Sequence, residues 1–256
     1  MSRNKKGAGA SSSKASGIRE QDAPTTLVPR LRFPEFRGGE GWRNSILTEL
    51  CDVNPDHDDL PESFYYIDLE SVEAGELQNL RNIERDSAPS RAQRYLRDGD
   101  ILYQTVRPYQ RNNLLFDFGG EDDHVASTGY AQLRARESVG FLYQLVHTDT
   151  FVAHALAKCT GSNYPAINSS DLASISVWIP PTPAEQQKIA DCLGSLDDRI
   201  AAEGRKLAAL REHKKGLMQQ LFPREGKTQP RLRFPEFRDA GEWNEATVGS
   251  KCKSFS

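Results

Sequence analysis

The chain has 256 residues, of which 37% are hydrophobic and 27% are charged, and its formal net charge is −3 at pH 7. This composition is typical of a soluble protein with one or two domains and a sizeable core. No apolar run reaches about 18 residues, which excludes a membrane-spanning helix, and no signal peptide is recognisable, so we expect a cytoplasmic protein. The cysteines form no Cys-x-x-Cys pair and are interpreted as reduced thiols; they are Cys51, Cys159, Cys192 and Cys252.

Residues 1–28 carry five basic and two acidic groups among Gly, Ala and Ser. Such a composition buries too little apolar surface to order itself, so we expect a disordered tail. Its basic groups are able to touch DNA phosphates, but we favour a solvated tail.

A nine-residue segment, Pro-Arg-Leu-Arg-Phe-Pro-Glu-Phe-Arg, occurs at residues 29–37 and again at 230–238, an offset of 201 residues. This period is far too long for a solenoid repeat and indicates duplication of a whole domain and its linker. We therefore expect residues 224–256 to be a linker followed by the start of a second, incomplete domain. Two more positions recur at the same offset: Trp42 as Trp243, and Cys51 as Cys252.

Residues 29–181 are predicted to form a mixed α/β domain of many short elements. Alternation and β-branched residues predict strands at Phe64–Leu69, Ile101–Val106 and Ile175–Ile179. Helical spacing predicts a helix at Phe151–Lys158, and Asp98-Gly99 and Gly119-Gly120 are predicted turns.

The charge of this domain argues against strong DNA binding by the domain alone. Residues 42–180 hold 11 basic and 21 acidic groups, a balance of −10, whereas DNA-binding domains normally carry a basic surface. The basic residues are concentrated locally, since residues 81–111 contain seven arginines against four acids.

Two loops are candidate DNA contacts. Arginine reads guanine and Asn or Gln reads adenine through paired hydrogen bonds, and a proline-stiffened loop suits that task. The first loop provides Arg107, Tyr109, Gln110, Arg111, Asn112 and Asn113; the alternative is an ordinary polar loop. The second provides Lys158, Ser162, Asn163 and Tyr164 for phosphate contacts, or simply packs Tyr164 on the core. Arg91 and Arg94 also suit phosphates, although we favour a solvated surface for both.

Residues 182–223 are predicted to form one long helix. Thr182 to Glu185 form a capping box with proline at the first helical position, and Phe222-Pro223 ends the helix. Thirty-nine residues from 183 to 221 give a rod of roughly 58 Å. The apolar spacing alternates between three and four residues, which predicts a coiled coil, with two charged residues in the seam. The predicted seam consists of Ile189, Leu193, Leu196, Ile200, Glu203, Leu207, Leu210, Lys214, Leu217 and Leu221.

The two charges predict an antiparallel self-pairing register. If Glu203 of one helix faces Lys214 of a second copy, Leu207 faces Leu210 and Ile200 faces Leu217. A slip of one heptad sets each charge against a leucine, which is costly, so the first register is favoured.

A catalytic role for the chain alone is rejected. His57 lies between two aspartates but lacks the partners of a metal site, and Glu212-His213-Lys214 lies on the long helix, where ion pairing is the ordinary role. No glycine-rich cofactor loop, P-loop or adenine-methylation motif occurs, so we expect no metal or cofactor on this chain.

Several segments resemble the specificity subunits of type I restriction–modification systems over roughly residues 29–256. The most specific is the junction Pro-Pro-Thr-Pro-Ala-Glu-Gln-Gln-Lys-Ile at residues 180–189, followed by a long helix that ends at residues 213–223. Residues 96–102, residues 127–130 and the repeated Leu-Arg-Phe-Pro-Glu-Phe are also similar to family members.

This resemblance implies that residues 29–181 are a target-recognition domain and that residues 182–223 are a spacer and dimerisation helix. Members carry two such domains, each of which reads one half of an interrupted double-stranded DNA site. Methyltransferase subunits, which bind S-adenosylmethionine, and restriction subunits dock on this non-catalytic scaffold.

This chain departs from the pattern because it holds one complete half. It is then either a natural half-length subunit that dimerises through its helix or a truncation, and a symmetric dimer predicts an interrupted palindromic target. Two alternatives stay open: a regulatory decoy that binds methyltransferase without directing it to DNA, and an independent nuclease.

Overall fold

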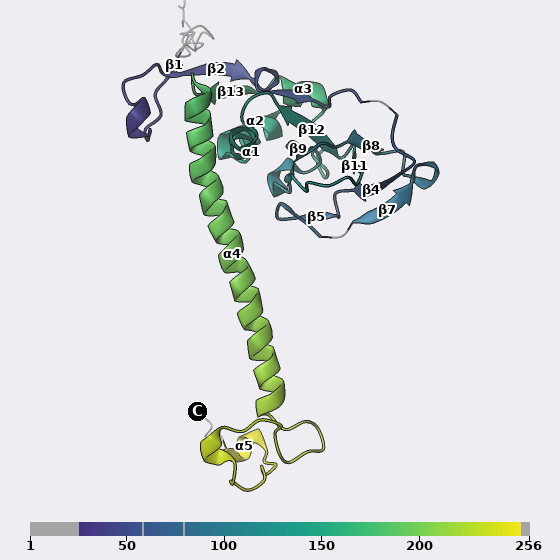
Figure 1. Cartoon of the computed structure of the whole chain (residues 1–256), viewed down its shortest axis with the longest axis vertical. Coiled ribbons are helices and arrows are strands. Elements are labelled where there is room, and N and C mark those ends of the chain that lie inside the picture. Colours follow the sequence, from purple (N-terminus) through teal and green to yellow (C-terminus); the bar gives the residue numbers. More distant parts are fainter. Residues whose placement is uncertain (1–25, 58, 79, 252–256) are drawn as a thin grey trace, which may run out of the picture. The chain divides into compact units, whose positions relative to one another are not determined.

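The computed structural model describes residues 26–251, apart from residues 58 and 79, so the expectations for residues 1–25 and Cys252 lie outside the described residues. The chain divides into two compact units between Asp191 and Cys192, which are described separately. Helix α4, Pro183–Leu221, begins in the first unit and continues into the second (Figure 1).

The first unit contains four small β-sheets. Strands β4 and β11 pair in parallel, and the other named pairs are antiparallel. Within each sheet the strands are given in spatial order. The first sheet consists of β1 (Thr26–Leu27), β2 (Trp42–Ile46) and β13 (Ser176–Ile179), and the second of β10 (Leu114–Phe116), β9 (Asp100–Gln104), β12 (Tyr130–Ala135) and β3 (Cys51–Val53). The third consists of β7 (Arg81–Glu84), β4 (Ser63–Ile67), β11 (His124–Ser127) and β8 (Ala92–Tyr95), and the fourth of β5 (Val72–Glu73) and β6 (Glu76–Leu77).

Short helices join and cover these sheets. The α-helices of the first unit are α1 (Val139–Val146), α2 (Asp149–Ala157) and α3 (Ser169–Ala173), and its 3-10 turns are η1 (Pro34–Phe36), η2 (Leu47–Glu49), η3 (Arg85–Ser87) and η4 (Pro108–Gln110). Each α-helix begins at a side-chain cap, because the oxygens of Ser138, Thr148 and Asn168 accept hydrogen bonds from the first turns. The second unit adds η5 (Pro235–Phe237) and α5 (Val248–Lys251).

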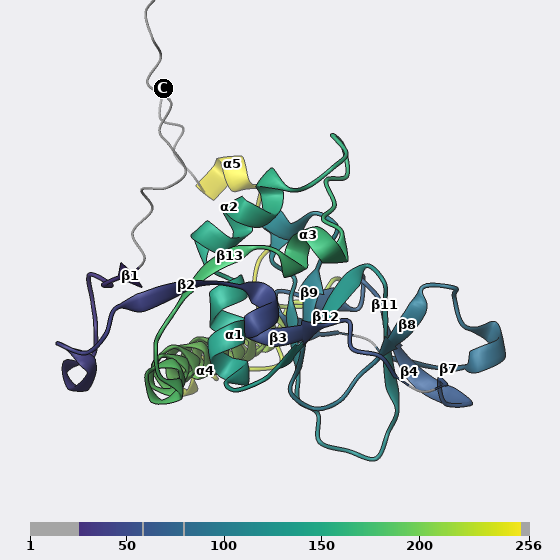
Figure 2. The same ribbon diagram turned by 90° about the horizontal axis from the view of Figure 1, so that it is seen from above.

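The β9–β12 sheet lies in the middle of the first unit. Ile101 and Tyr103 of β9 point into the largest core cluster, together with residues of α1 and α2, whereas Leu102 points into a second cluster on the opposite face. This alternation is the two-residue period of a strand that is buried on both faces. Figure 2 shows α1 and α2 on one side of this sheet and β4, β7 and β8 on the other.

The predicted elements of this unit are confirmed with small shifts at their ends. The strands predicted at residues 64–69, 101–106 and 175–179 correspond to β4, β9 and β13, and the helix predicted at 151–158 corresponds to α2. Gly99, with φ of 86°, forms the predicted turn before β9.

Helix α4 has the predicted start and end, but its first turns pack differently from the prediction. Thr182 accepts the expected hydrogen bond from the Glu185 amide (3.3 Å), whereas the Glu185 carboxylate is turned away to other partners described below, so the capping box is only half formed. Ala190 packs so closely on α1 that a Cβ added to Gly140 would lie 3.0 Å from the Ala190 Cβ.

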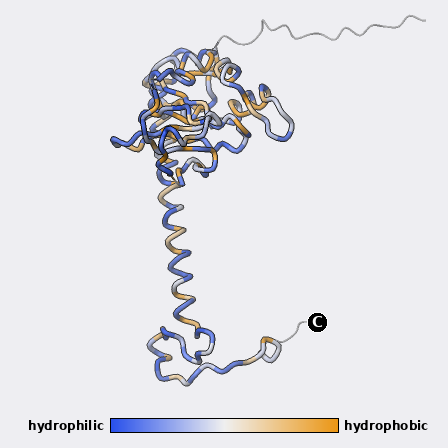
Figure 3. Tube along the Cα trace, turned by 90° about the vertical axis from the view of Figure 1, so that its right-hand side faces the viewer, coloured by the Kyte–Doolittle hydropathy of each residue, from blue (hydrophilic) through white to orange (hydrophobic). Residues whose placement is uncertain are grey.

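Ile189 is a correction to the predicted seam, because it packs against the core of the first unit. The seam residues from Leu193 to Leu210 are exposed, Ile200 at 70%, whereas Leu217 and Leu221 are half-buried. Apolar positions recur along the helix in Figure 3. In the part of the chain that the structure describes, no helix is both long and apolar enough to cross a membrane.

Candidate nucleic-acid interface

The two loops predicted to contact DNA lie against each other, although about 50 residues of sequence separate them. Thr160 and Ala166 pair as a short hairpin (N···O 2.9 and 3.0 Å), and this hairpin bonds to the chain after β9. The Ile167 amide donates to the Thr105 carbonyl (3.0 Å) and the Arg107 amide to the Pro165 carbonyl (2.7 Å). Backbone hydrogen bonds therefore hold the two loops side by side, and together they form one surface.

Arg107 and Tyr164 form the contact at the centre of this surface. The Arg107 guanidinium lies 4.2 Å from the centre of the Tyr164 ring, and Tyr164 is 65% exposed. Within the described residues the Arg107 side chain makes no hydrogen bond or ion pair, and its Nε is buried without a partner. A stacked guanidinium with unused donors is suited to bind a phosphate or a base edge.

The backbone of both loops is held in sparsely populated conformations. Arg107 and Arg111 flank η4 with φ of 55° each, in the left-handed region that non-glycine residues rarely occupy. Gly161, with φ of 87°, has no room for a Cβ, which would meet the Tyr164 carbonyl oxygen at 3.1 Å. Strain of this kind persists where the surrounding structure fixes it and is concentrated at functional sites.

Gln104 braces the first loop from beneath, which the sequence did not indicate. Its buried side chain donates to the Gln110 Oε1 (2.9 Å) and accepts from the Asn112 amide (3.2 Å). The backbone N–H of Gln104 donates to the Asn113 Oδ1 (2.8 Å). The only feature of the sequence that could have indicated this role is the position of Gln104 at the end of a predicted buried strand, directly before a loop that contains proline.

Asn113 is held inside the domain, whereas Arg111 is half-buried and tied to α2. Asn113 is 1% exposed and its amide group bonds to Gln104 and His147. Arg111 donates to the His147 carbonyl (2.9 Å) and pairs with Asp149 at the start of α2. The Asn113 amide group is buried and already bonded, so we assign Asn113 a structural role, and the two bonds of Arg111 hold the loop against α2.

The remaining loop residues lie at the surface. Tyr109 and Gln110 are exposed beside Arg107, and Ser162 and Asn163 are exposed in the hairpin. Asn112 is half-buried and its Oδ1 accepts from the Ala74 amide (3.2 Å), whereas Lys158 lies at the end of α2, 4.0 Å from Asp171.

Arg94 lies in β8, the edge strand of a different sheet, and Arg91 directly precedes that strand. Arg91 is exposed, as a phosphate contact requires. Burial lowers the pKa of the Arg94 guanidinium, and its Nε has no partner in the described part of the chain. The Arg91 carbonyl accepts from the Thr128 amide (2.8 Å), and the carbonyl of the next residue, Gly129, accepts from the Thr105 amide (3.0 Å), so Arg91 is linked to the chain after β9.

A buried ion pair fixes the start of α4, and sequence reasoning did not find it. Arg32 donates from Nε and Nη2 to the two Glu185 carboxylate oxygens (2.7 Å each), and the Trp42 Nε1 donates to the same carboxylate (3.1 Å). The two side chains of the ion pair are 6% and 1% exposed. Arg32 also donates to the carbonyl oxygens of Gly39 (3.3 Å) and Glu40 (2.8 Å).

This ion pair shifts the pKa values of Arg32 and Glu185 so that the charged form of each side chain is favoured. The hydrogen bond from Arg32 is the main reason that the pKa of Glu185 is lowered, and the bond to Glu185 likewise raises the pKa of Arg32. The first repeat segment, residues 29–42, is thereby tied to the helix. One feature of the sequence could have indicated this contact: Arg32 and Trp42 recur together as Arg233 and Trp243, 201 residues later.

The described residues include histidines, carboxylates and three free thiols. No group of three or more His, Cys, Asp or Glu side chains there is arranged to hold a metal ion. Cys51, Cys159 and Cys192 are free, and burial raises the pKa of the Cys51 thiol to about 12.

Comparison with known proteins finds similar chains among subunits of type I restriction systems. A specificity subunit of the type I restriction enzyme HindI from Haemophilus influenzae is 28% identical over 130 residues, which are 49% of this chain and 27% of that protein. The HsdS subunit of Thermoanaerobacter tengcongensis is 28% identical, with a TM-score of 0.54, over 80% of this chain and 54% of that one. The S subunit of M. genitalium, at 16% identity and a TM-score of 0.53 over 77% of this chain and 49% of that one, shares the fold.

The chain thus spans about a quarter of the HindI subunit and about half of the two structural relatives. Residues 40–212 match the family described as type I restriction modification DNA specificity domain. This match covers more than half of the sequence and includes both loops and most of α4. The chain therefore belongs to the family of type I restriction modification DNA specificity domains.

Proposed function

We propose that this protein recognises one half of an interrupted DNA site within a type I restriction–modification complex. The observation that carries the proposal is the joined surface of the two loops, with the unpaired Arg107 guanidinium stacked on exposed Tyr164. Relatives with 28% identity are named specificity subunits, which do no chemistry themselves, so the chain has a non-catalytic role. The residues that we assign to DNA contact are Arg107, Tyr109, Gln110, Ser162, Asn163 and Tyr164, with Arg91 as a peripheral phosphate contact.

Methyltransferase and restriction subunits are the proposed protein partners. The domain carries a charge of −10 over residues 42–180, so its own attraction to phosphates is weak. A methyltransferase subunit that binds S-adenosylmethionine would add phosphate contacts, and the complex would then bind DNA tightly where the single chain does not.

Self-association through α4 is the second part of the proposal. The exposed Leu193, Leu196 and Ile200 form an apolar stripe that one chain leaves uncovered, and Leu207 and Leu210 extend it. An antiparallel pair in which Glu203 faces Lys214 covers this stripe from Leu196 onward without an unpaired buried charge. Two identical readers related by a two-fold axis recognise inverted half-sites.

Selection from a random DNA library tests the recognition role. The full chain, purified with its methyltransferase subunit, is expected to enrich an interrupted palindrome. Arg107→Ala should weaken binding, and should relax one base preference if Arg107 reads a base. Arg85→Ala serves as a matched control, because Arg85 lies in η3 after β7 and donates to the Leu60 carbonyl. No enrichment by an intact complex contradicts the proposal, and an asymmetric motif contradicts the symmetric dimer.

A regulatory decoy is the second candidate, and the acidic balance of the domain favours it. In that case the chain occupies methyltransferase subunits without directing them to a sequence. The same selection separates the two functions, because a decoy forms the complex and enriches no motif.

A further inference from the structure

The second repeat segment, residues 230–243, folds like the first. Arg233 donates from Nη1 to the Ala240 carbonyl and from Nη2 to the Gly241 carbonyl (2.8 Å). These carbonyls lie 201 residues after those of Gly39 and Glu40, which Arg32 binds through the same two nitrogens. The 3-10 turn η5 likewise repeats η1. The segment therefore adopts this conformation without a carboxylate in the place that Glu185 takes in the first segment.

The two segments differ in what their arginine binds beyond these carbonyls. Arg32 pairs with Glu185 on the first turn of α4, and Trp42 donates to the same carboxylate. Among the residues that the structure describes, Arg233 has no carboxylate within ion-pair distance and the Trp243 Nε1 makes no hydrogen bond. The donors that hold a helix start in the first segment are unoccupied in the second.

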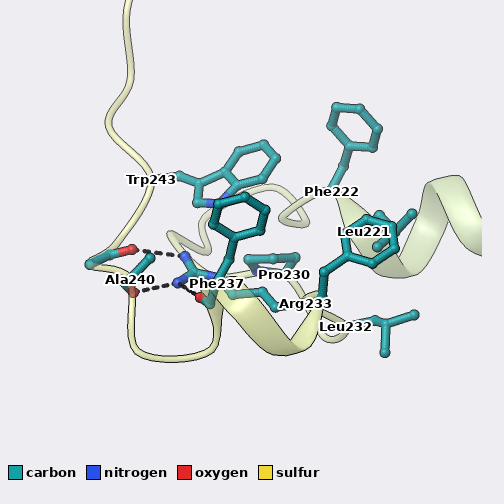
Figure 4. A pocket seen from close by; sticks show the side chains of 10 residues that line it. Leu221, Phe222, Pro230, Leu232, Arg233, Phe237, Ala240 and Trp243 are labelled. Carbon is teal, nitrogen blue, oxygen red and sulfur yellow. Dashed lines mark hydrogen bonds between the residues drawn. The ribbon is translucent and has the colours of Figure 1, made fainter.

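An apolar cavity of about 500 Å³ lies beside Arg233. Figure 4 shows Phe237 and Trp243 on one side and Leu221 and Phe222 on another, with Arg233 bonded to the backbone. Phe234, Phe237 and Trp243 are all exposed at this surface. A guanidinium fixed by backbone carbonyls among exposed aromatic rings is prepared to pair with a carboxylate and to cover apolar surface.

The first segment also contacts a second charged residue of α4, which indicates what else a helix docked on the second segment would carry. Lys188, three residues after Glu185 and on the same side of the helix, lies 3.4 Å from Glu35 and 5.7 Å from the centre of the Phe33 ring. Glu236 and Phe234 occupy the corresponding places in the second segment. A ligand with a glutamate and then a lysine three residues later therefore matches both the charge and the shape of this surface.

We propose that the second repeat segment is a docking site for the first turns of a helix, other than α4 of the same chain, that carries glutamate and, three residues later, lysine. Arg233 and Trp243 bind the glutamate, and Glu236 binds the lysine. The chain's own Glu185 is buried against Arg32 and is not available, so the ligand comes from a helix start other than that of α4 in the same chain. This docking goes beyond DNA recognition and does not depend on it.

A peptide that copies residues 182–200 is the probe. With Gln187→Lys in the peptide, a lactam formed between the Lys amine and the Asp191 carboxylate with loss of water replaces the Gln187–Asp191 hydrogen bond and holds the peptide helical. Circular dichroism verifies its helicity. Fluorescence anisotropy measures its binding to the full chain. We expect the peptide to bind at least tenfold more tightly than a control peptide with Glu185→Gln, and the difference to disappear in the full-chain variant Arg233→Gln.

Arg231→Gln is the matched control in the full chain, because it removes the same charge two residues away and outside the contacts of Arg233. Equal affinity for the two helical peptides, or binding that Arg233→Gln leaves unchanged, overturns the proposal. The assay contains no DNA, so its failure leaves the recognition role standing, and a failed DNA selection leaves this docking site standing.

Discussion

At the scale of single residues, the candidate interface depends on a few side chains that fix backbone rather than on many that point outward. Gln104 braces the first loop, Gly161 permits the hairpin turn, and Arg111 ties the loop to α2. These contacts leave the Arg107 and Tyr164 pair at the surface in one arrangement. A prearranged pair loses less conformational entropy on binding than two free side chains.

Replacement of Tyr164 tests the stacked pair. Tyr164→Ala removes the ring beneath the Arg107 guanidinium and is expected to weaken DNA binding by the methyltransferase complex by about fivefold, roughly 1 kcal/mol. Tyr164→Phe keeps the ring and should retain affinity. Equilibrium binding with a fluorescent half-site duplex measures both, and an equal loss in the two variants would assign the effect to the hydroxyl group instead.

Replacement of Gln104 tests the brace. Gln104→Ala removes the bonds to Gln110 and to the Asn112 amide, and is expected to lower the free energy of unfolding by about 1–3 kcal/mol, because polar groups in the buried part of the loop lose partners. Gln110→Ala, at the exposed end of the same bond, should cost less than about 0.5 kcal/mol. Urea denaturation compares the variants; a smaller loss for Gln104→Ala than for Gln110→Ala would contradict the assignment.

At the scale of elements, α4 has two different functions along its length. Its first two turns belong to the core of the first unit through Glu185, Gln186 and Ala190. From Leu193 to Leu210 its apolar stripe is uncovered, whereas Leu217 and Leu221 are half-buried. Three glycines weaken this stretch by about 1 kcal/mol each relative to alanine, which is consistent with a helix that depends on a partner.

The attachment of the first repeat segment to α4 is expected to depend on pH. Because Arg32 lowers the pKa of Glu185 below its ordinary value of 4.5, the unfolded chain binds more protons than the folded one in that range. The contact therefore contributes fully above about pH 4.5 and is lost as pH falls through the lower folded value.

Glu185→Gln should abolish this pH dependence and lower Tm already at neutral pH. Thermal unfolding between pH 3 and 7 measures the effect, with Glu49→Gln as the control at an exposed pair with Arg43. A wild-type profile that Glu185→Gln does not change would show that another carboxylate is responsible.

Charge in the seam tests helix pairing. Leu207→Asp with Leu210→Asp is expected to abolish the dimer, since four carboxylates would face one another in the proposed register. Ala202→Asp with Ala209→Asp, on another face of the same helix, adds the same charge and should leave the dimer intact. Sedimentation equilibrium reports the mass of each variant, and dimers that persist in the first variant would exclude this interface.

At the scale of the whole molecule, charge rather than shape limits DNA binding. A recognition domain with ten more acidic than basic groups repels the phosphate backbone outside its local arginines. If the joined loops read DNA as we propose, this charge leads us to expect that a second subunit supplies much of the affinity.

Salt dependence measures that division. The chain alone is expected to bind DNA weakly, with a shallow slope of log affinity against log salt, and the methyltransferase complex to bind tightly with a steeper slope, because it releases more counterions. Titrations between roughly 50 and 200 mM salt give both slopes. An equal slope for the chain and the complex would mean that this chain supplies the phosphate contacts.

The sequence by itself determined the local elements and the family. Helix α4, β4, β9, β13 and α2 were predicted because periodicity, caps and prolines act within a few residues of each other. The resemblance at residues 180–189 was likewise a local pattern. The repeat indicated a duplicated unit but not what its arginine binds.

Tertiary structure alone decided the long-range contacts. Glu185 was predicted to complete a capping box, yet its carboxylate binds Arg32, 153 positions away, because a buried bidentate ion pair satisfies it better than one backbone amide. Asn113 was predicted to face DNA, yet it is buried under its own loop. No local pattern brings residues 105–107 beside residues 160–167; backbone hydrogen bonds and close packing between distant segments do so.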